Sequence, residues 1–167
     1  MGRITIGLFF AGLILAGFGL ALRLYMGRSA ENVLQPGERV TLAELRDPIP
    51  GNAFLACSPG YCAATAAPSP VFALSVDRLA KDWAEMIAGE NNVIEVEDEP
   101  AAHRLVLIQH TPLVRFPDII TVEFVALAPD RSSLAIYSRA RYGRGDFGTN
   151  RKRVLRWLHQ LQAVAAQ

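Results

Sequence analysis

The strongest chemical signal in the sequence is a basic segment that runs from Arg131 to Arg156. It carries eight cations and one acid, whereas residues 31–130 carry six cations and fifteen acids. Three of its glycines precede an expected helix, and glycine lets a backbone approach a ligand closely. The start of that helix adds free N–H groups and a positive dipole end, which attract anions. The pattern predicts an anion site with the candidate ligands Arg139, Arg141, Arg144, Asn150 and Arg151.

A structural interpretation of the basic segment stays open beside this one. Its cations could pair with acids of the other half of the chain, namely Glu95, Glu97, Asp98, Glu99 and Glu123. The segment GRGDFGTN is no P-loop, because it lacks the Gly-Lys-Ser/Thr ending. Nucleic-acid binding is not expected, since the rest of the chain is acidic and begins with an apolar stretch typical of a membrane anchor.

A second candidate pocket consists of His110, Arg115 and Asp118. The three fall within nine residues around a Phe-Pro-Asp turn, so their side chains could converge. Histidine and aspartate can transfer protons, which would suit an enzyme. The plainer interpretation is a hydrogen-bonded histidine at a strand end and a turn-stabilising ion pair. The sequence has no G-x-S-x-G, no H-E-x-x-H and no metal-spaced histidines, so we assign no catalytic residue, metal or cofactor.

The two cysteines, Cys57 and Cys62, lie in the segment CSPGYC, where Pro59-Gly60 favours a turn. A turn would bring the thiols together, and a disulfide that closes so short a loop fits an oxidising compartment. Reduced structural thiols and a redox or metal role are the alternatives, although a structural zinc site needs four ligands. We expect the disulfide.

Apolar periodicity predicts the elements that position these groups. The expected order is strand, helix, four strands, helix. Connections of hairpin length indicate an α+β domain, with an antiparallel, bent sheet of about five strands packed by two helices. The expected strands are residues 71–76, 92–97, 104–111, 118–127 and 132–139.

The two expected helices, residues 76–90 and 150–165, each carry one apolar stripe. Trp83 lies on the first stripe and Trp157 on the second, so both should be buried against the same sheet. Side chains that can cap a helix start precede each stripe. The candidate caps are Ser75 or Asp77 for the first helix and Thr149 or Asn150 for the second.

Residues 4–22 carry no charge and include only one polar side chain, that of Thr5. As a helix, these 19 residues would rise about 28 Å, close to the thickness of a bilayer core. An uncleaved transmembrane anchor is therefore expected; a cleaved signal peptide is the alternative, but no clear cleavage site follows. Flanking cations slightly favour a cytoplasmic domain, whereas the cysteines favour the periplasm. We expect a single-pass inner-membrane protein with a periplasmic domain, and the cytoplasmic orientation stays open.

The chain divides into three parts on this interpretation. Residues 1–28 hold the transmembrane anchor. Residues 29–70 are rich in Pro, Gly and Ala, which indicates a linker that includes the disulfide loop. Residues 71–167 form the α+β domain.

The chain also resembles the family catalogued as domain of unknown function 1499, over about residues 50–162. The resemblance is carried by the segments NAFLACSPGYC, SPVFALSVDRLAKDW, RFPDIITVEF and LAIYSRARYGRGDFGTNRKRVLRWL. It implies a compact α+β domain, often in membrane-anchored or exported proteins. It implies no activity and no catalytic residues.

Three functions are compatible with these patterns. The first is a membrane-anchored envelope module, not an enzyme, that binds an anionic small molecule or a lipid headgroup at the basic segment. The second is an assembly or scaffold protein that docks a membrane-protein partner, which an exposed apolar patch beside the basic segment would favour. The third is an enzyme that uses His110, Arg115 and Asp118, which requires a pocket where these side chains meet.

Overall fold

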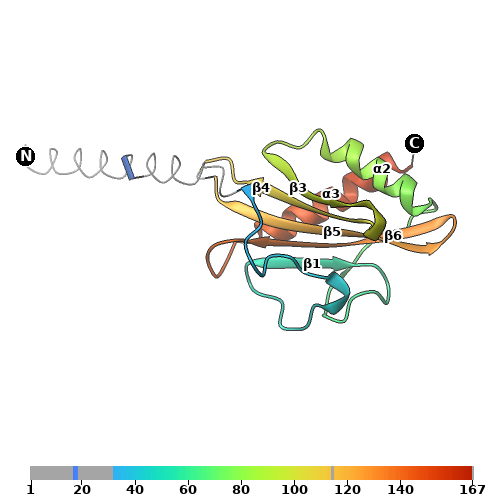
Figure 1. Ribbon diagram of the computed structural model, residues 1–167, viewed down its shortest axis with the longest axis horizontal. Coiled ribbons are helices and arrows are strands. Elements are labelled where there is room, and N and C mark those ends of the chain that lie inside the picture. The colour runs from blue at the N-terminus through green and yellow to red at the C-terminus, as the bar shows by residue number, and fades with distance from the viewer. Residues whose placement is uncertain (1–16, 19–31, 114, 167) are drawn as a thin grey trace, which may run out of the picture.

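The computed structural model describes residues 17–18, 32–113 and 115–166. This part of the chain is an α+β fold with one six-stranded sheet and two α-helices (Figure 1). The elements, in chain order, are η2 (Leu42–Glu44), β1 (Ala53–Cys57), β2 (Ala67–Pro68), α2 (Val76–Ile87), β3 (Val93–Glu99), η3 (Pro100–Ala102), β4 (Arg104–His110), β5 (Pro117–Ala128), β6 (Arg131–Ala140) and α3 (Thr149–Val164).

The strands lie in the order β2-β1-β6-β5-β4-β3. All neighbours are antiparallel except β1 and β2, which are parallel, so the sheet is mixed and not purely antiparallel as we expected. Both of these strands lie in the segment 29–70, where we expected only linker and loop. The strand expected at 71–76 is reduced to a single bridge between Phe72 and Ser132, because Ser75 already caps α2.

Helices α2 and α3 cover one face of the sheet, which we call the helix face (Figure 1). The side chain of Ser75 accepts a hydrogen bond from Arg78 N, as expected of a cap. Trp83 and Trp157 are fully buried there and meet edge to face, with ring centroids 5.8 Å apart. Trp83 also contacts the ring of Phe124 of β5 at 6.1 Å. The two tryptophans therefore lock both helices to each other and to the sheet, as their stripes predicted.

The opposite side of the sheet, the back face, is covered by the chain between residues 32 and 70. Leu42 and Leu55 pack there against Ala135 and Tyr137 of β6. Leu34 packs farther along against Val106, Ile108 and Ile119. Both faces of the central strands are therefore buried, which explains why residues 105–108 of β4 are apolar without interruption.

Cys57 and Cys62 form the expected disulfide, with their Cα atoms 6.1 Å apart. The bond joins the end of β1 to the loop that follows it. Cys57 is buried in the same apolar cluster as Leu55, so the disulfide fastens this loop to the back face.

The anchor expected at residues 4–22 lies outside the described residues, apart from Gly17 and Phe18. No helix in the described part of the chain has the length and apolar character needed to cross a membrane. The anchor and its orientation therefore stay predictions from the sequence.

The packing of the two tryptophans can be tested by truncation. Trp157→Ala should lower the free energy of unfolding by about 3–5 kcal/mol, because it leaves a cavity between both helices and the sheet. Leu155→Ala, on the exposed side of the same helix, should cost about 1 kcal/mol or less. Denaturant unfolding followed by near-UV circular dichroism measures both. Equal, small losses in the two variants would contradict the packing described here.

Candidate functional site

A buried polar network surrounds the guanidinium group of Arg153, on the second turn of α3. Its Nε donates to Gln109 Oε1 of β4 and its Nη2 to Asp118 Oδ2 of β5, both at 2.5 Å. Its Nη1 donates to Ser138 Oγ of β6 at 2.9 Å and to Asn150 Oδ1 at 2.5 Å. One side chain thus ties the start of α3 to three strands.

The burial of Asp118 shapes the energetics of this network. The side chains of Asp118 and Arg153 are only 4% and 6% exposed. Burial raises the pKa of Asp118, and the attraction of Arg153 offsets this only in part. The pair is therefore costly to bury, and it depends on the neutral partners that complete its hydrogen bonds.

Asn150, one of the expected anion ligands, belongs to the same network and is fully buried. Its Nδ2 donates to Asn52 O at 3.0 Å, and its Oδ1 also accepts from Ser138 at 2.6 Å. Asn52 in turn donates to the carbonyl oxygens of Ala140 and Gly143. Asn150 therefore holds the loop between β6 and α3 in place.

The start of α3 is capped by Asp146, not by Thr149 or Asn150 as we expected. Its two carboxylate oxygens accept from Gly148 N at 2.9 Å and from Asn150 N at 2.7 Å. Gly148 holds the N-cap position with φ 75°, so the chain enters the helix through a left-handed residue that offers no capping side chain. Burial would raise the pKa of Asp146, but these N–H donors outweigh burial and lower it. An internal carboxylate thus occupies part of the position that we expected an anion to take.

Arg141 and Arg139 lie toward the back face, next to the N-terminal segment. Arg141 is buried and donates to both carboxylate oxygens of Glu38, at 2.8 and 2.7 Å, and to Val33 O at 3.0 Å. Burial would raise the pKa of Glu38, but the hydrogen bonds from Arg141 and from Gln35 N outweigh it and lower that pKa. Arg139 shares this neighbourhood and contributes to the same lowering.

The two other expected ligands, Arg144 and Arg151, are exposed. Arg144 has no ion-pair partner among the described residues. The guanidinium group of Arg151 stacks over the ring of Phe54, 5.8 Å from its centroid. The structure therefore does not bring the five expected ligands together at one point.

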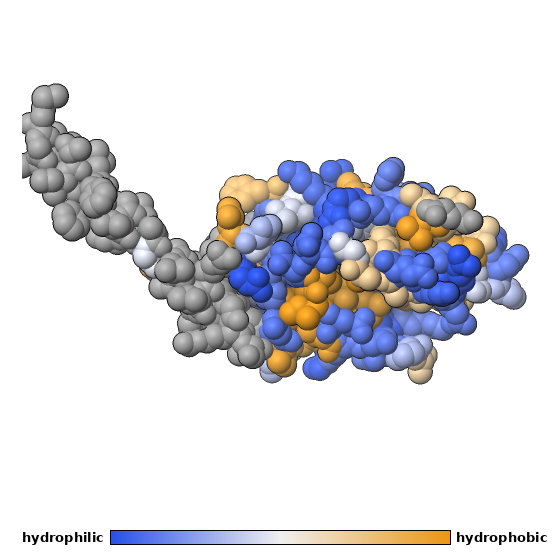
Figure 2. All heavy atoms as spheres, turned by 90° about the horizontal axis from the view of Figure 1, so that it is seen from above, coloured by the Kyte–Doolittle hydropathy of each residue, from blue (hydrophilic) through white to orange (hydrophobic). Residues whose placement is uncertain are grey.

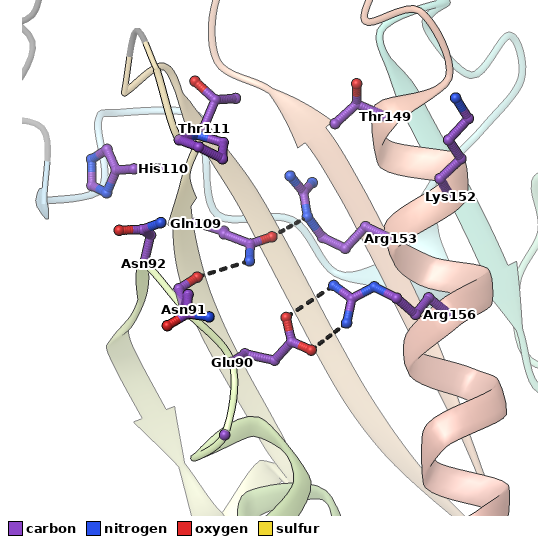
Figure 3. A pocket seen from close by; sticks show the side chains of 12 residues that line it. Glu90, Asn91, Asn92, Gln109, His110, Thr111, Thr149, Lys152, Arg153 and Arg156 are labelled. Atoms are coloured by element: carbon purple, nitrogen blue, oxygen red, sulfur yellow. Dashed lines mark hydrogen bonds and ion pairs between the residues drawn. The ribbon is translucent and has the colours of Figure 1, made fainter.

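The structure also separates the members of the second candidate pocket. In the register of β4 and β5, Gln109 pairs with Asp118 and His110 pairs with Pro117. Gln109 and Asp118 consequently face α3, whereas His110 points to the other side (Figure 3). His110 is buried, and burial together with Arg115 and Arg141 lowers its pKa. Asp118 is bonded to Arg153, so these residues form no proton-transfer pair.

An open cleft of about 510 Å³ lies between the first turns of α3 and the loop that joins α2 to β3 (Figure 3). We call it the α3 cleft. Arg153 and Arg156 extend from α3 into the cleft, and Lys152 also belongs to its lining, with a side chain that extends away from the strands in Figure 3. Its remaining lining includes Glu90, Asn91, Asn92, Gln109, Thr111 and Thr149. The described residues contain no group of side chains suited to hold a metal ion.

The charges of this cleft are largely compensated within the protein. The two terminal nitrogens of Arg156 bind the two carboxylate oxygens of Glu90, and the carboxylate of Asp118 neutralises the charge of Arg153. Lys152 is exposed and has no ion-pair partner among the described residues, so it is the uncompensated charge. Lys152 and Arg156 were not among the ligands predicted from the sequence, because only the fold brings the first turns of α3 beside the loop that joins α2 to β3.

The unequal roles of two neighbouring arginines can be tested with matched substitutions. Arg153→Leu should lower the free energy of unfolding by about 3–5 kcal/mol, because it leaves Asp118 buried without a cation. Arg156→Leu should cost about 0–1 kcal/mol, since its pair with Glu90 is partly exposed. Thermal and denaturant unfolding measure the two losses. A similar loss in both variants would show that the buried network does not hold α3.

The cap at Asp146 predicts a pH dependence. Asp146→Ala should lower the free energy of unfolding at neutral pH by about 0.5–2 kcal/mol. Because the pKa of Asp146 is lowered on folding, its contribution is complete above 3.8, the ordinary value, and is lost as pH falls through the lowered pKa. The difference between variant and wild type should therefore narrow in acid. A difference that stays constant down to acid pH would contradict the cap at Asp146.

The comparisons with known proteins bear on family membership alone. No curated protein and no solved structure is similar enough to this chain to count as a match. The family described as protein of unknown function DUF1499 matches residues 60–161, from the disulfide loop to the last turns of α3. This match includes the buried network, the Asp146 cap and the α3 cleft. The chain therefore belongs to the DUF1499 family of proteins of unknown function.

Proposed function

We propose that the protein is a single-pass inner-membrane protein whose periplasmic domain binds an anionic small molecule or a lipid headgroup without catalysing a reaction. The observation that carries this proposal is the α3 cleft, whose lining includes an uncompensated cation and several amide and hydroxyl groups. Its volume of about 510 Å³ falls within the range typical of small-molecule sites. The Cys57–Cys62 disulfide supports an oxidising compartment.

The cleft suits a polar anion better than an apolar molecule. Lys152 supplies the charge, and Asn91, Asn92 and Thr149 can donate or accept hydrogen bonds. The space between sheet and helices is filled by Trp83 and Trp157, so it cannot take an acyl chain. A lipid ligand would have to bind through its headgroup and keep its chains outside the domain.

No enzyme is proposed from His110, Arg115 and Asp118. Catalysis by this set needs the side chains in one pocket, and His110 and Asp118 point to opposite faces of the sheet. A scaffold protein is the second candidate. The observation in its favour is a group of exposed apolar side chains beside the basic segment, at Phe116, Tyr142 and Phe147. A stoichiometric protein partner that co-purifies from native membranes would decide for it.

The binding proposal is tested with three charge-removing variants of the full chain in nonionic detergent. Inorganic phosphate and glycerol phosphate should raise the melting temperature of the wild type at low salt. Lys152→Gln should weaken this binding about tenfold or more, because it removes the uncompensated charge, and should leave the melting temperature without ligand nearly unchanged. Calorimetric titration measures the affinities.

Two other variants locate the site. Lys81→Gln changes the same charge on the exposed side of α2 and should bind like the wild type. Arg144→Gln removes the unpaired arginine of the β6–α3 loop. If only Arg144→Gln weakens binding, the site lies at the loop, as the sequence alone indicated, and not in the α3 cleft. If neither anion stabilises the wild type, the binding proposal is wrong.

A further inference from the structure

Four large apolar side chains are exposed at one end of the domain. Leu113 and Phe116 lie in the β4–β5 loop and are 82% and 37% exposed. Tyr142 and Phe147 lie in the β6–α3 loop, where Tyr142 is 43% exposed and Phe147 is fully exposed. Phe116, Tyr142 and Phe147 line one shallow hollow of about 360 Å³. Soluble domains seldom expose such a group without a partner.

These two loops lie at the end of the domain where the continuously described chain begins (Figure 1). Arg141 connects these loops to the start of the described chain. Its backbone N–H donates to Pro117 O, and its side chain donates to Val33 O. Only nine residues, 23–31, separate the described residue Asn32 from the apolar stretch 4–22. Nine residues span at most about 32 Å when fully extended. A membrane anchor at 4–22 would therefore keep this end of the domain close to the bilayer.

Cations accompany the apolar side chains in both loops. Arg115 lies between Leu113 and Phe116, and Arg144 lies between Tyr142 and Phe147. The acid in these loops, Asp146, directs both carboxylate oxygens at the start of α3. Figure 2 shows apolar residues at the surface toward this end of the domain, with charged residues around them. Aromatic rings flanked by arginines are typical of segments that lie in the headgroup region of an anionic membrane.

We propose that Leu113, Arg115, Phe116, Tyr142, Arg144 and Phe147 form a loop face that docks onto the surface of an anionic bilayer. The occupant is the lipid surface to which the anchor tethers the domain, and the proposal rests on the anchor that the proposed function includes. The side chains that would contact the membrane do not include Lys152, to which the proposed function assigns anion binding. It would bring the α3 cleft to headgroup level, because Thr111 and Thr149 line both the cleft and the hollow of the loop face.

A tryptophan at position 147 reports on docking with little risk to the fold. Trp83 and Trp157 are fully buried, so they contribute a constant background. Phe147→Trp places a third indole on the loop face, at a fully exposed site that already carries an aromatic ring. Leu127→Trp places it at the opposite end of the domain, near the β5–β6 turn, where Leu127 is exposed to a similar degree as Phe116 (Figure 1). This second variant is the control for position, at a site that is less exposed than Phe147.

Each full-length variant is reconstituted into vesicles of phosphatidylcholine, alone or mixed with phosphatidylglycerol, with and without brominated acyl chains. The emission of Phe147→Trp should shift to the blue and be quenched several-fold more than that of Leu127→Trp. The difference in quenching between the two variants should be larger with phosphatidylglycerol. Adding Arg144→Gln to the Phe147→Trp variant should reduce this difference. Equal quenching at both positions, or none, would overturn the proposal.

The remaining outcomes also give a decision. If the full chain does not float with vesicles after an alkaline wash, the anchor is absent and the docking proposal is wrong. A blue shift that grows with protein concentration and is insensitive to brominated lipid would assign the loop face to a second copy. A shift that appears only with a co-purified protein would assign it to a scaffold partner. Phosphate binding by Lys152, measured in detergent, is independent of all these results, so the two proposals can fail separately.

Discussion

The buried ion pair between Arg153 and Asp118 is the interaction on which the functional end of the domain depends. Taking two charges out of water is unfavourable unless every donor finds an acceptor, and here Gln109, Ser138 and Asn150 complete the set. Because these partners come from β4, β5, β6 and the first turns of α3, the network can form only when these elements are in one relative position. It fixes where α3 begins, and thereby the β6–α3 loop and one wall of the α3 cleft.

The back face uses the same principle to hold the N-terminal segment. Glu38 binds Arg141, and the buried carboxylate of Glu123 accepts from Leu42 N and from the hydroxyl of Tyr61. Burial and the hydrogen bond to Glu123 raise the pKa of Tyr61 to about 12. These contacts explain much of the charge asymmetry in the sequence: Arg141, Arg153 and Arg156 each hold an acid within the fold. An external anion, if the proposed binding holds, would therefore have to be bound by the cations without such partners.

The sequence predicted the elements that follow simple periods and missed those that do not. The stripes that include Trp83 and Trp157 predicted both helices, and the turn at Pro59-Gly60 predicted the disulfide. Strand β1 was missed because AFLAC is short, apolar throughout and bordered by turn residues, so it shows no alternation. The site was harder to predict: His110 ends β4 and Asp118 lies at the start of β5, and only the register of these two strands sets the side chains on opposite faces. The Asp146 cap was missed because the helix is entered through Gly148, two residues beyond the capping acid.

The arrangement that results places a rigid cleft and an exposed loop face at the same end of one domain. The buried network resists movement of α3, so a ligand in the α3 cleft would meet a preformed site and lose little free energy to reorganisation. The loop face differs from the cleft, because its apolar side chains are exposed to water and do not pack in the core. A domain tethered by a short segment at that end would meet lipid headgroups far more often than a free protein would, because tethering raises their effective concentration. Even a modest affinity of the α3 cleft for one headgroup, of the kind that an uncompensated lysine and a few amides could provide, would then suffice for binding at the membrane.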